Sequence, residues 1–239
     1  MKENTLAGIV KKAKKIVFFG GAGVSKGSGI PDFRGTGGLY TADCAESPEE
    51  ILSGTYLKRF PEKFYSYYRK NMLYPNAKPN AAHLTLAKWE REGKLTSVIT
   101  QNIDGLHQKA GSKRVYELHG TTLKNYCYRC GKSFDIDFID GYDGVPYCPC
   151  GGIVKPDVVL YGEQLNGKTL QGAIDAIAEA DLLIVGGTSL TVYPAAGLID
   201  YFEGDALVLI NRDATPFDDR ADLVIREPVG RTLESVVFE

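Results

Sequence analysis

The sequence has no apolar run near the roughly 18 residues that a membrane-spanning helix needs. Its opening residues, MKENTLAGIVKKAKK, lack the apolar core and the small-residue cleavage site of a secretory signal, so we expect a cytoplasmic protein without membrane partners. The sequence also has no large excess of positive or negative charge, because its 28 Lys and Arg and 30 Asp and Glu give a net charge of −2. That balance is far from the basic composition of nucleic-acid-binding proteins, so we expect no direct nucleic-acid partner.

Cysteine and histidine are scarce. The 239 residues include five cysteines and three histidines, and a chain of this length buries enough surface to fold without disulfides. Cys44 stands alone, whereas the other four cysteines lie between Cys127 and Cys150. In a reducing compartment, so tight a cluster indicates a metal site rather than disulfides.

The clustered cysteines form one C-x₂-C pair and one C-x-C pair: Cys127, Cys130, Cys148 and Cys150. Each pair can make a hairpin-like knuckle, and two knuckles complete a tetrahedral thiolate site for one structural zinc ion. Gly131 and Gly151 follow the pairs, where a tight knuckle turn needs glycine. Four thiolates close the coordination, so such a zinc takes no part in chemistry. A redox-active pair at the C-x₂-C motif is the alternative.

Continuous apolar stretches alternate with helical patterns along most of the chain. Strands are predicted at Ile16–Phe19, Leu95–Thr100, Val115–His119, from Val158 onward, at Leu182–Val185 and at Ala206–Ile210, and helices over residues 5–15, 80–92 and 170–180. Apolar strands that alternate with helices indicate an α/β fold, in which a parallel sheet is covered on both faces.

Residues 36–82 differ in kind from the rest of the chain. They are rich in Tyr, Phe, Lys and Glu and carry apolar residues at helical spacing. Pro48 and Pro61 stand where helices start, because proline is well accommodated in a first helical turn. We therefore predict a small helical insertion here.

The predicted strands end in polar or glycine-rich loops. These loops cover residues 20–34, 100–104, 186–190 and 211–213. Since ligands of parallel sheets bind beyond the carboxyl ends of the strands, the four loops are candidates for one site.

The first of these loops begins Gly20-Gly21-Ala22-Gly23. Glycines directly after a first strand let the backbone approach a pyrophosphate. The match to a dinucleotide-binding fingerprint is incomplete, however, because the third glycine falls at Gly27, one residue late. A plain tight turn explains these glycines equally well.

The same loop continues through Asp32, Phe33 and Arg34 within a Gly- and Pro-rich stretch. Together these side chains offer a carboxylate, an aromatic face and a cation to a polar ligand. A buried Asp–Arg pair is the structural alternative.

The polar residues after the second strand and one of the histidines complete the candidate site. Gln101 and Asn102 suit ribose hydroxyls and carboxamides, which need paired donors and acceptors. His119 precedes a glycine at the end of an element, and its ordinary pKa of about 6.5 suits a general base. We expect His83, within a helix, to be structural, and His107 stays ambiguous.

The motifs GAGVSKGSGIPDFRG, TQNIDGLH, LHG, the two cysteine pairs, KPDVVLYGE, GTSL and INRD occur in this order over almost the whole chain. Together they closely resemble the sirtuin family of NAD-dependent protein deacylases. Each motif alone is weak evidence, whereas the ordered set leaves little room for chance.

The resemblance implies a Rossmann-like parallel sheet with a smaller zinc-ribbon plus helical module. The large domain would comprise residues 1–35, 83–120 and 155–239, and the small one residues 36–82 and 121–154. NAD and an acyl-lysine peptide would enter the cleft between them, and the enzyme would transfer the acyl group from lysine to ADP-ribose with release of nicotinamide.

The resemblance also implies roles for single positions. NAD would be bound by Gly21, Ala22, Gly23, Lys26, Phe33, Arg34, Gln101, Asn102, Ile103, Asp104, Gly187, Thr188, Ser189, Asn211, Arg212, Asp213 and Val229. The acyl-lysine would be bound by Val158, Val159, Tyr161 and Gly162, with backbone pairing of the kind that adds a strand to an edge. His119 would be the catalytic base, which takes a proton from a ribose hydroxyl after the acyl oxygen has attacked the ribose carbon that nicotinamide vacates.

Two positions depart from the family pattern. Lys26 replaces small, hydroxylic or acidic residues, so its ammonium would contact a phosphate or face solvent. Relatives that remove acidic acyl groups use a Tyr and an Arg three residues apart, whereas Tyr65 here has Tyr68 at that spacing and Arg69 one step beyond. We therefore expect a preference for neutral acyl groups over succinyl. The loop at residues 226–230, which contacts adenine in relatives, aligns loosely.

Two rival functions share part of this pattern. An NAD glycohydrolase or mono-ADP-ribosyltransferase would also release nicotinamide, but it would not need the KPDVVLYGE segment for an acyl-lysine. A zinc-ribbon binding module without activity would leave the strand-end loops unexplained.

Overall fold

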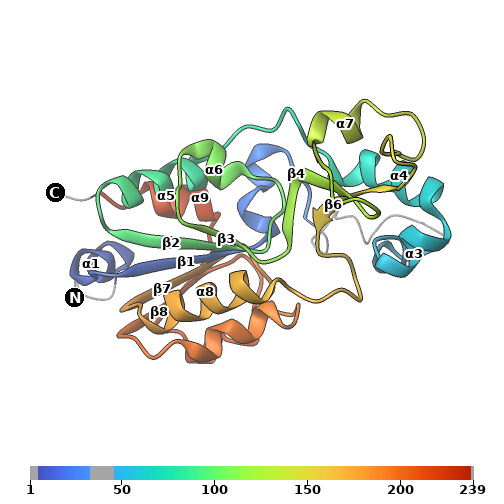
Figure 1. The fold of residues 1–239 in the computed structure, drawn as a ribbon. Coiled ribbons are helices and arrows are strands. Elements are labelled where there is room, and N and C mark those ends of the chain that lie inside the picture. Colours follow the sequence, from blue (N-terminus) through green and yellow to red (C-terminus); the bar gives the residue numbers. More distant parts are fainter. Residues whose placement is uncertain (1–4, 33–45, 238–239) are drawn as a thin grey trace.

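The computed structural model describes residues 5–32 and 46–237, and Figure 1 shows a helix-covered sheet beside a smaller unit. Phe33, Arg34 and Cys44 lie outside the described residues. The two ends of the described chain lie at the same end of the molecule, away from the smaller unit (Figure 1). No helix in residues 5–32 and 46–237 has the length and apolar character that crossing a bilayer requires.

Six parallel strands form the large sheet. Their spatial order is β3-β2-β1-β7-β8-β9, and every neighbouring pair runs parallel. The strands are β1 (Ile16–Gly20), β2 (Leu95–Thr100), β3 (Val115–Glu117), β7 (Leu182–Gly186), β8 (Ala206–Ile210) and β9 (Leu223–Ile225). In this order β1 and β7 are central, and both are fully buried. Burial on both faces explains why the sequence of these strands is continuously apolar.

Helices cover both faces of this sheet (Figure 1). One face carries α1 (Leu6–Lys12), α5 (Ala81–Arg91), α6 (Leu106–Ala110) and α9 (Val229–Glu234), and the other carries α8 (Gly167–Ala178) and the 3₁₀ helix η4 (Ala195–Tyr201). Alternate residues of β1 belong to two different apolar clusters. Phe18 is in the cluster that includes Trp89 of α5, whereas Phe19 is in the one that includes Ile177 of α8. The predicted α/β architecture is therefore confirmed.

The smaller unit combines short helices with an antiparallel sheet of order β5-β4-β6. Its helices are α2 (Pro48–Ile51), α3 (Gly54–Arg59), α4 (Pro61–Met72) and α7 (Ile136–Asp140), and its strands are β4 (Gly120–Cys127), β5 (Ser133–Asp135) and β6 (Val154–Val158). Pro48 and Pro61 each occupy a first helical turn, as predicted. A separate apolar cluster, which includes Phe64, Tyr65 and Tyr68 of α4, holds the unit together.

The structure differs from the sequence prediction at several places. Strands β4 and β5 and helices α6 and α7 were not predicted, and β3 ends at Glu117 rather than at His119. The strand expected from Val158 onward is β6, which ends at Val158 and pairs with β4 in the small sheet. Strand β9 and helix α9 were not predicted, because the strand has three residues and the helix has six. Elements this short carry too little periodicity to be recognised.

Candidate functional site: a cavity at the carboxyl edge of the parallel sheet

A cavity of about 1030 Å³ lies where the carboxyl ends of the parallel strands face the smaller unit. The loops after β1, β2, β7 and β8 supply one wall, as the position of ligands in open parallel sheets requires. The opposite wall comes from α4 and from the chain after β6. The volume of the cavity lies at the upper end of the range of roughly 300–1,000 Å³ that small-molecule sites occupy.

Most of the predicted site residues line this one cavity. They are Ala22, Gly23, Lys26, Gln101, Asn102, Ile103, Asp104, His119, Val158, Val159, Tyr161, Gly162, Gly187, Thr188, Ser189, Asn211, Arg212, Asp213 and Val229. Phe33 and Arg34 lie outside the described residues. Gly21 packs behind the wall against Thr188 and Gln101.

The glycines of the first loop allow two backbones to touch. A Cβ at Gly23 would lie 2.7 Å from Gly187 Cα, and a Cβ at Gly21 would lie 2.7 Å from Thr188 Cβ. Gly187 has a φ of +63°, and a Cβ there would lie 2.6 Å from Val24 N. The Gly23 amide donates to the Gly187 carbonyl at 2.8 Å. Side chains at these positions would push the loops after β1 and β7 apart and change the cavity wall.

A hydrogen-bond network joins the loops after β1, β2 and β7. Thr188 Oγ1 donates to Gln101 Oε1 at 2.9 Å, while Gln101 Nε2 is buried without a partner among the described residues. Asn102 Nδ2 donates to Ser25 Oγ at 3.0 Å, and Ser25 Oγ donates to Asp104 Oδ2 at 2.6 Å. An unpaired buried donor costs free energy, so the network has capacity for a polar ligand.

His119 lies at the junction of the two walls, directly before β4. Its Nδ1 is 2.9 Å from the Gln101 carbonyl oxygen, which can only accept, so Nδ1 carries the proton and Nε2 is left with a lone pair. Burial lowers the pKa of His119 below its usual value, and the bond to the Gln101 carbonyl opposes that shift. A neutral imidazole with a free Nε2 can accept a proton at neutral pH.

The other two histidines lie within the described part of the chain but do not line the cavity. His83 and His107 are buried with their ring centroids 4.7 Å apart. Burial lowers the pKa of His83 to about 4 and that of His107 to about 3. His83 Nδ1 accepts from the Asn80 amide at the start of α5, which gives it the structural position predicted for it.

The chain after β6 forms the wall opposite the strand-end loops. The Val159 amide donates to the His119 carbonyl at 2.9 Å. Tyr161 bonds through its backbone on both sides, from its amide to Leu52 and from the Gly54 amide to its carbonyl. These bonds place the predicted substrate residues within one rigid segment beside His119.

Helix α4 contributes Tyr68, which is fully buried, to the cavity wall. The Tyr68 hydroxyl has no partner among the described residues, and burial raises its pKa, so it stays neutral. Tyr65 donates to the Val154 carbonyl, and the Arg69 guanidinium donates to the Ile139 and Gly144 carbonyls. The cation that could receive an acidic group is therefore committed to backbone oxygens.

Lys26 lines the cavity but pairs with an acid. Its ammonium lies 2.9 Å from Asp32 Oδ2, and its side chain is 42% exposed. The sequence left a phosphate contact and a solvent-facing position open, and the ion pair is a third arrangement. This ion pair links the loop after β1 to Asp32.

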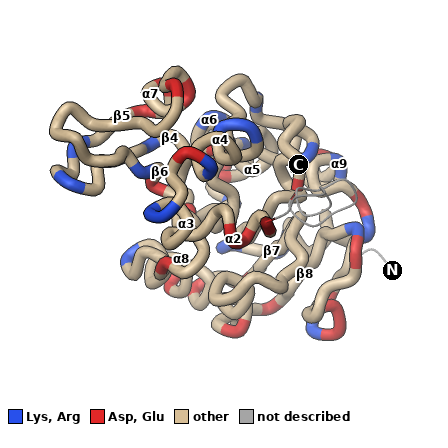
Figure 2. Tube along the Cα trace, turned by 90° about the vertical axis from the view of Figure 1, so that its right-hand side faces the viewer, with Lys and Arg blue, Asp and Glu red and all other residues tan. Residues whose placement is uncertain are grey.

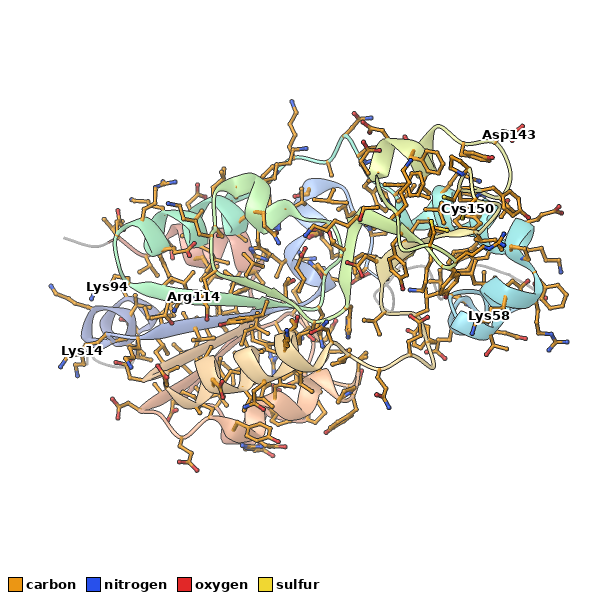
Figure 3. The ribbon with its side chains drawn as sticks, viewed as in Figure 1. Lys14, Lys58, Lys94, Arg114, Asp143 and Cys150 are labelled. Carbon is orange, nitrogen blue, oxygen red and sulfur yellow. The ribbon has the colours of Figure 1, made fainter. Side chains whose placement is uncertain are left out.

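The four clustered cysteines lie in the smaller unit, away from the cavity (Figure 3, Cys150). Their sulfur atoms all lie within 4.8 Å of one another, with Cys127 Sγ 3.5 Å from Cys150 Sγ and Cys130 Sγ 3.7 Å from Cys148 Sγ. A zinc ion with four Zn–S bonds of about 2.3 Å needs sulfur–sulfur distances of about 3.8 Å. The cluster therefore fits a tetrahedral zinc ion.

Both knuckle turns have the glycine that the spacing predicts. Gly131 and Gly151 have φ values of +71° and +82°, and their amides donate to the Cys127 and Cys148 carbonyls at 2.9 and 2.8 Å. A left-handed conformation of this kind favours glycine, so the turns explain why glycine follows each pair.

The residues that line the cavity belong to a chain whose similarity to a known family extends over most of its length. Residues 21–194 match the Sir2 family. The chain belongs to this family.

Relatives of this Sir2-family protein match it over nearly their whole length. A protein of Clostridium acetobutylicum, named NAD-dependent protein deacetylase, is 56% identical over 240 residues, covering 99% of this chain and 98% of that protein. A protein of Clostridium perfringens with the same name is 55% identical, with the same coverage.

Solved structures of the family agree with this fold. Sir2 with a deacetylated p53 peptide and 3'-O-acetyl ADP-ribose is 39% identical, has a TM-score of 0.89, and matches 98% of this chain and 96% of that one. Sir2 with a p53 peptide and NAD⁺ is 40% identical, has a TM-score of 0.87, and matches 99% and 97%.

Several cavity residues of this Sir2-family protein were not among the predicted site residues, and Ser25, Asn80 and Tyr68 are polar ones that bear on its chemistry. Ser25 follows the predicted glycines and could have been included on its hydroxyl alone. Asn80 caps α5 and donates to the Val24 carbonyl and to Ser28, which only the fold brings near. In the sequence, Tyr68 bears only on the spacing from Tyr65, in the motif of relatives that remove acidic acyl groups, and it is not among the predicted site residues.

Proposed function

We propose that this protein is an NAD-dependent protein-lysine deacetylase that transfers the acetyl group to ADP-ribose and releases nicotinamide. The observation that carries the proposal is the cavity, which joins the glycine loops, the Gln101–Thr188 network and His119 to the segment after β6. Relatives named NAD-dependent protein deacetylase and Sir2 structures with NAD⁺ or acetyl ADP-ribose support it.

We assign NAD to the wall made by the strand-end loops. The backbone of Gly21, Ala22 and Gly23 approaches the pyrophosphate, with Lys26 beside it, and Thr188 and Ser189 contact phosphate and ribose. Gln101 and Asn102 contact the ribose, and the unpaired Gln101 Nε2 supports that role because it offers a donor. Ile103 and Asp104 hold the nicotinamide carboxamide. The adenosine side belongs to Gly187, Asn211, Arg212, Asp213 and Val229, and Phe33 and Arg34 act from the segment outside the described residues.

We assign the acyl-lysine to Val158, Val159, Tyr161 and Gly162, with the peptide backbone added as a strand to this segment. After nicotinamide has left and the acyl oxygen has taken its place on the ribose, His119 removes a proton from the adjacent ribose hydroxyl. The neutral Nε2 receives that proton, and the Gln101 carbonyl stabilises the imidazolium that forms. The deprotonated ribose oxygen attacks the carbon that carries the acyl oxygen, and water then completes the release of free lysine and acetylated ADP-ribose.

One zinc ion bound by the four cysteines would supply structural cross-linking of the smaller unit, with no open coordination position for chemistry. The division into residues 1–35, 83–120 and 155–239 against 36–82 and 121–154 is part of the proposal. Separate apolar clusters in the two units support it, and β6 is the strand at which the chain passes between them. We also place the protein in the cytoplasm, since four free thiols gathered as metal ligands suit a reducing compartment.

The test is product analysis by mass spectrometry after incubation with NAD and an acetyl-lysine peptide. We expect three products in equal amounts: free-lysine peptide, nicotinamide and acetylated ADP-ribose, and none without NAD. Release of ADP-ribose while the peptide keeps its acetyl group would make the protein an NAD glycohydrolase or ADP-ribosyltransferase instead.

A further inference from the structure

We propose that Lys155 is a positioning residue for the peptide substrate, which holds residues 158–163 at the cavity wall through an ion pair between its buried ammonium and the partly exposed Glu163. The inference rests on the proposed deacetylase function and deepens it. Lys155 belongs to β6 and is not among the cavity-lining residues of the described chain, so it acts through the segment that follows.

The ammonium of Lys155 is buried and fully used. Its side chain is 3% exposed, and Nζ lies 3.0 Å from Glu163 Oε2, 2.6 Å from the Val158 carbonyl and 3.1 Å from the Pro156 carbonyl. A lysine ammonium has three N–H donors, and three acceptors surround this one. It also lies 5.7 Å from the ring centre of Tyr126 in β4.

Burial of a lysine in this way costs desolvation free energy, which only paired and well-oriented acceptors offset. The packing of the smaller unit does not need such a charge, because an apolar side chain of similar length would fill the same space. The charge of Lys155 instead fixes the conformation of the chain that follows β6. Lys155 and Glu163 lie eight positions apart in the sequence, and their contact closes a loop around the residues between them.

Glu163 fastens the far end of that loop. Its Oε2 accepts from the Leu160 amide at 2.9 Å, and its own amide donates to the Leu160 carbonyl at 2.9 Å. Gly54 leaves space for this carboxylate, since a Cβ there would lie 3.0 Å from Glu163 Oε1. The ion pair therefore fixes both the carbonyl of Val158 and the turn at Leu160.

Val158 and Val159 lie next to the base and line the cavity. Val158 is bonded to Lys155 through its carbonyl, and Val159 is bonded to the His119 carbonyl through its amide. Loss of the lysine charge would release the first of these two anchors and leave the second. A segment held at one point less would present the same groups to a peptide at a higher entropic cost, without touching the NAD wall.

The experiment compares Lys155→Met with the matched control Lys94→Met. Lys94 also donates to two backbone carbonyls, those of Lys11 and Ala13, but lies at the opposite end of the large sheet (Figure 3). We expect Lys155→Met to raise the peptide KM at least tenfold while kcat changes less than threefold and the NAD KM less than twofold. An increase in KM alone is the signature of lost binding common to ground and transition states. Lys94→Met should leave all three constants within twofold.

Two further variants keep the test decisive. Lys155→Arg retains a cation on a long side chain and should restore the peptide KM to within about threefold of the wild type. Glu163→Gln keeps an oxygen for the Leu160 amide but removes the charge, so it should raise the peptide KM in the same direction even if Lys155→Met does not fold.

Hydrogen exchange supplies a readout that is independent of activity. In Lys155→Met the amides of Val159, Leu160 and Tyr161 should exchange at least tenfold faster, whereas those of β7 keep their wild-type rates. Unchanged peptide KM and unchanged exchange in a folded Lys155→Met protein would overturn the inference. A wild-type protein that deacetylates no peptide would instead refute the proposed function, and the exchange rates would still decide whether Lys155 orders the segment.

Discussion

The carboxyl edge of the large sheet and the four-cysteine cluster both gather polar side chains, and they use them in opposite ways. At the sheet edge, the Gln101 side chain and the His119 ring are each held by one hydrogen bond, through Gln101 Oε1 and His119 Nδ1, which leaves Gln101 Nε2 and His119 Nε2 available to a ligand. In the cluster, the four sulfur atoms face one another and no cysteine lines the cavity among the described residues. The first arrangement suits a reaction, and the second suits a framework.

The same contrast separates the histidines. His119 is partly buried and bonded so that one nitrogen remains available, while His83 and His107 are fully buried against each other. Residue type alone does not distinguish the three, but position relative to the strand ends does. Charged residues give no comparable contrast, because Lys and Arg are interspersed with Asp and Glu along the chain trace in Figure 2.

The largest expected effect tests the reactive side of the comparison. His119→Ala should lower kcat/KM for an acetyl-lysine peptide by about 10²-fold or more, because the proton acceptor is lost. Circular dichroism and the thermal midpoint should stay close to wild type. Unchanged deacetylation by the folded variant would remove His119 from the mechanism.

The framework side is tested next, by removal of the metal. A strong chelator, or Cys130→Ser, should release zinc and open the smaller unit to proteolysis, and activity should fall roughly tenfold or more along with that structure. Zinc content, limited proteolysis and activity are measured on one sample. Activity lost while the smaller unit stays resistant to protease would contradict a purely structural ion.

A smaller effect concerns the acyl group that the cavity accepts. Arg69 is bound to backbone carbonyls and the neutral Tyr68 lines the cavity, so a succinyl carboxylate would meet no unpaired cation among the described residues of α4. We expect kcat/KM for an acetyl peptide to exceed that for the matched succinyl peptide at least tenfold. Faster removal of succinyl would show that the cavity is polar where it holds the acyl group.

The smallest expected effect sharpens the contrast among the histidines. The folded-state pKa values of His83 and His107, about 4 and about 3, lie below the ordinary value of 6.5. Below pH 6.5 these two histidines therefore bind protons in the unfolded chain but remain neutral in the folded one. Stability is complete above pH 6.5 and is lost as the pH falls toward 4, by about 1.4 kcal/mol per pH unit and histidine. Urea unfolding at several pH values measures this slope, and His107→Leu should reduce it. An unchanged slope in that variant would show that His107 is protonated in the fold.

The pH dependence of the reaction should differ from that of stability. Burial lowers the pKa of His119, so the neutral base persists on the acid side of its ordinary value. We expect kcat/KM to be constant above pH 6.5 and to fall only at lower pH, in measurements over a pH range where the fold is intact.

Much of the sheet could be predicted because parallel strands that are buried on both faces have continuously apolar sequences. Ala206–Ile210 was predicted with its observed bounds for that reason. β6 could not be placed, since Pro156 and Asp157 interrupt its pattern and its partner β4 carries Lys124 and Asn125. Pairing between strands distant in sequence is decided by the packing of the smaller unit.

The candidate site followed from one physical rule, that loops at the carboxyl ends of parallel strands meet. The rule located Gln101 and Thr188 but gave no information on the opposite wall, which is built by a helix and by the chain after β6. Tyr68 and Lys155 therefore needed coordinates, because their importance lies in what their terminal atoms reach.

Strand β4 begins beside His119 and ends at the metal-ligand residue Cys127. At about 3.3 Å per residue, its seven steps span at most about 23 Å between the His119 end and the cysteine cluster. That span exceeds the screening length of roughly 10 Å for exposed charges in ordinary buffers, so the charge of the cluster has little effect at His119. Exchange of zinc for cadmium should therefore leave the fall of kcat/KM at low pH unchanged. Any coupling between the two sites would be mechanical and would act through the pairing of Gly120 with Val158 and of Cys127 with Val154.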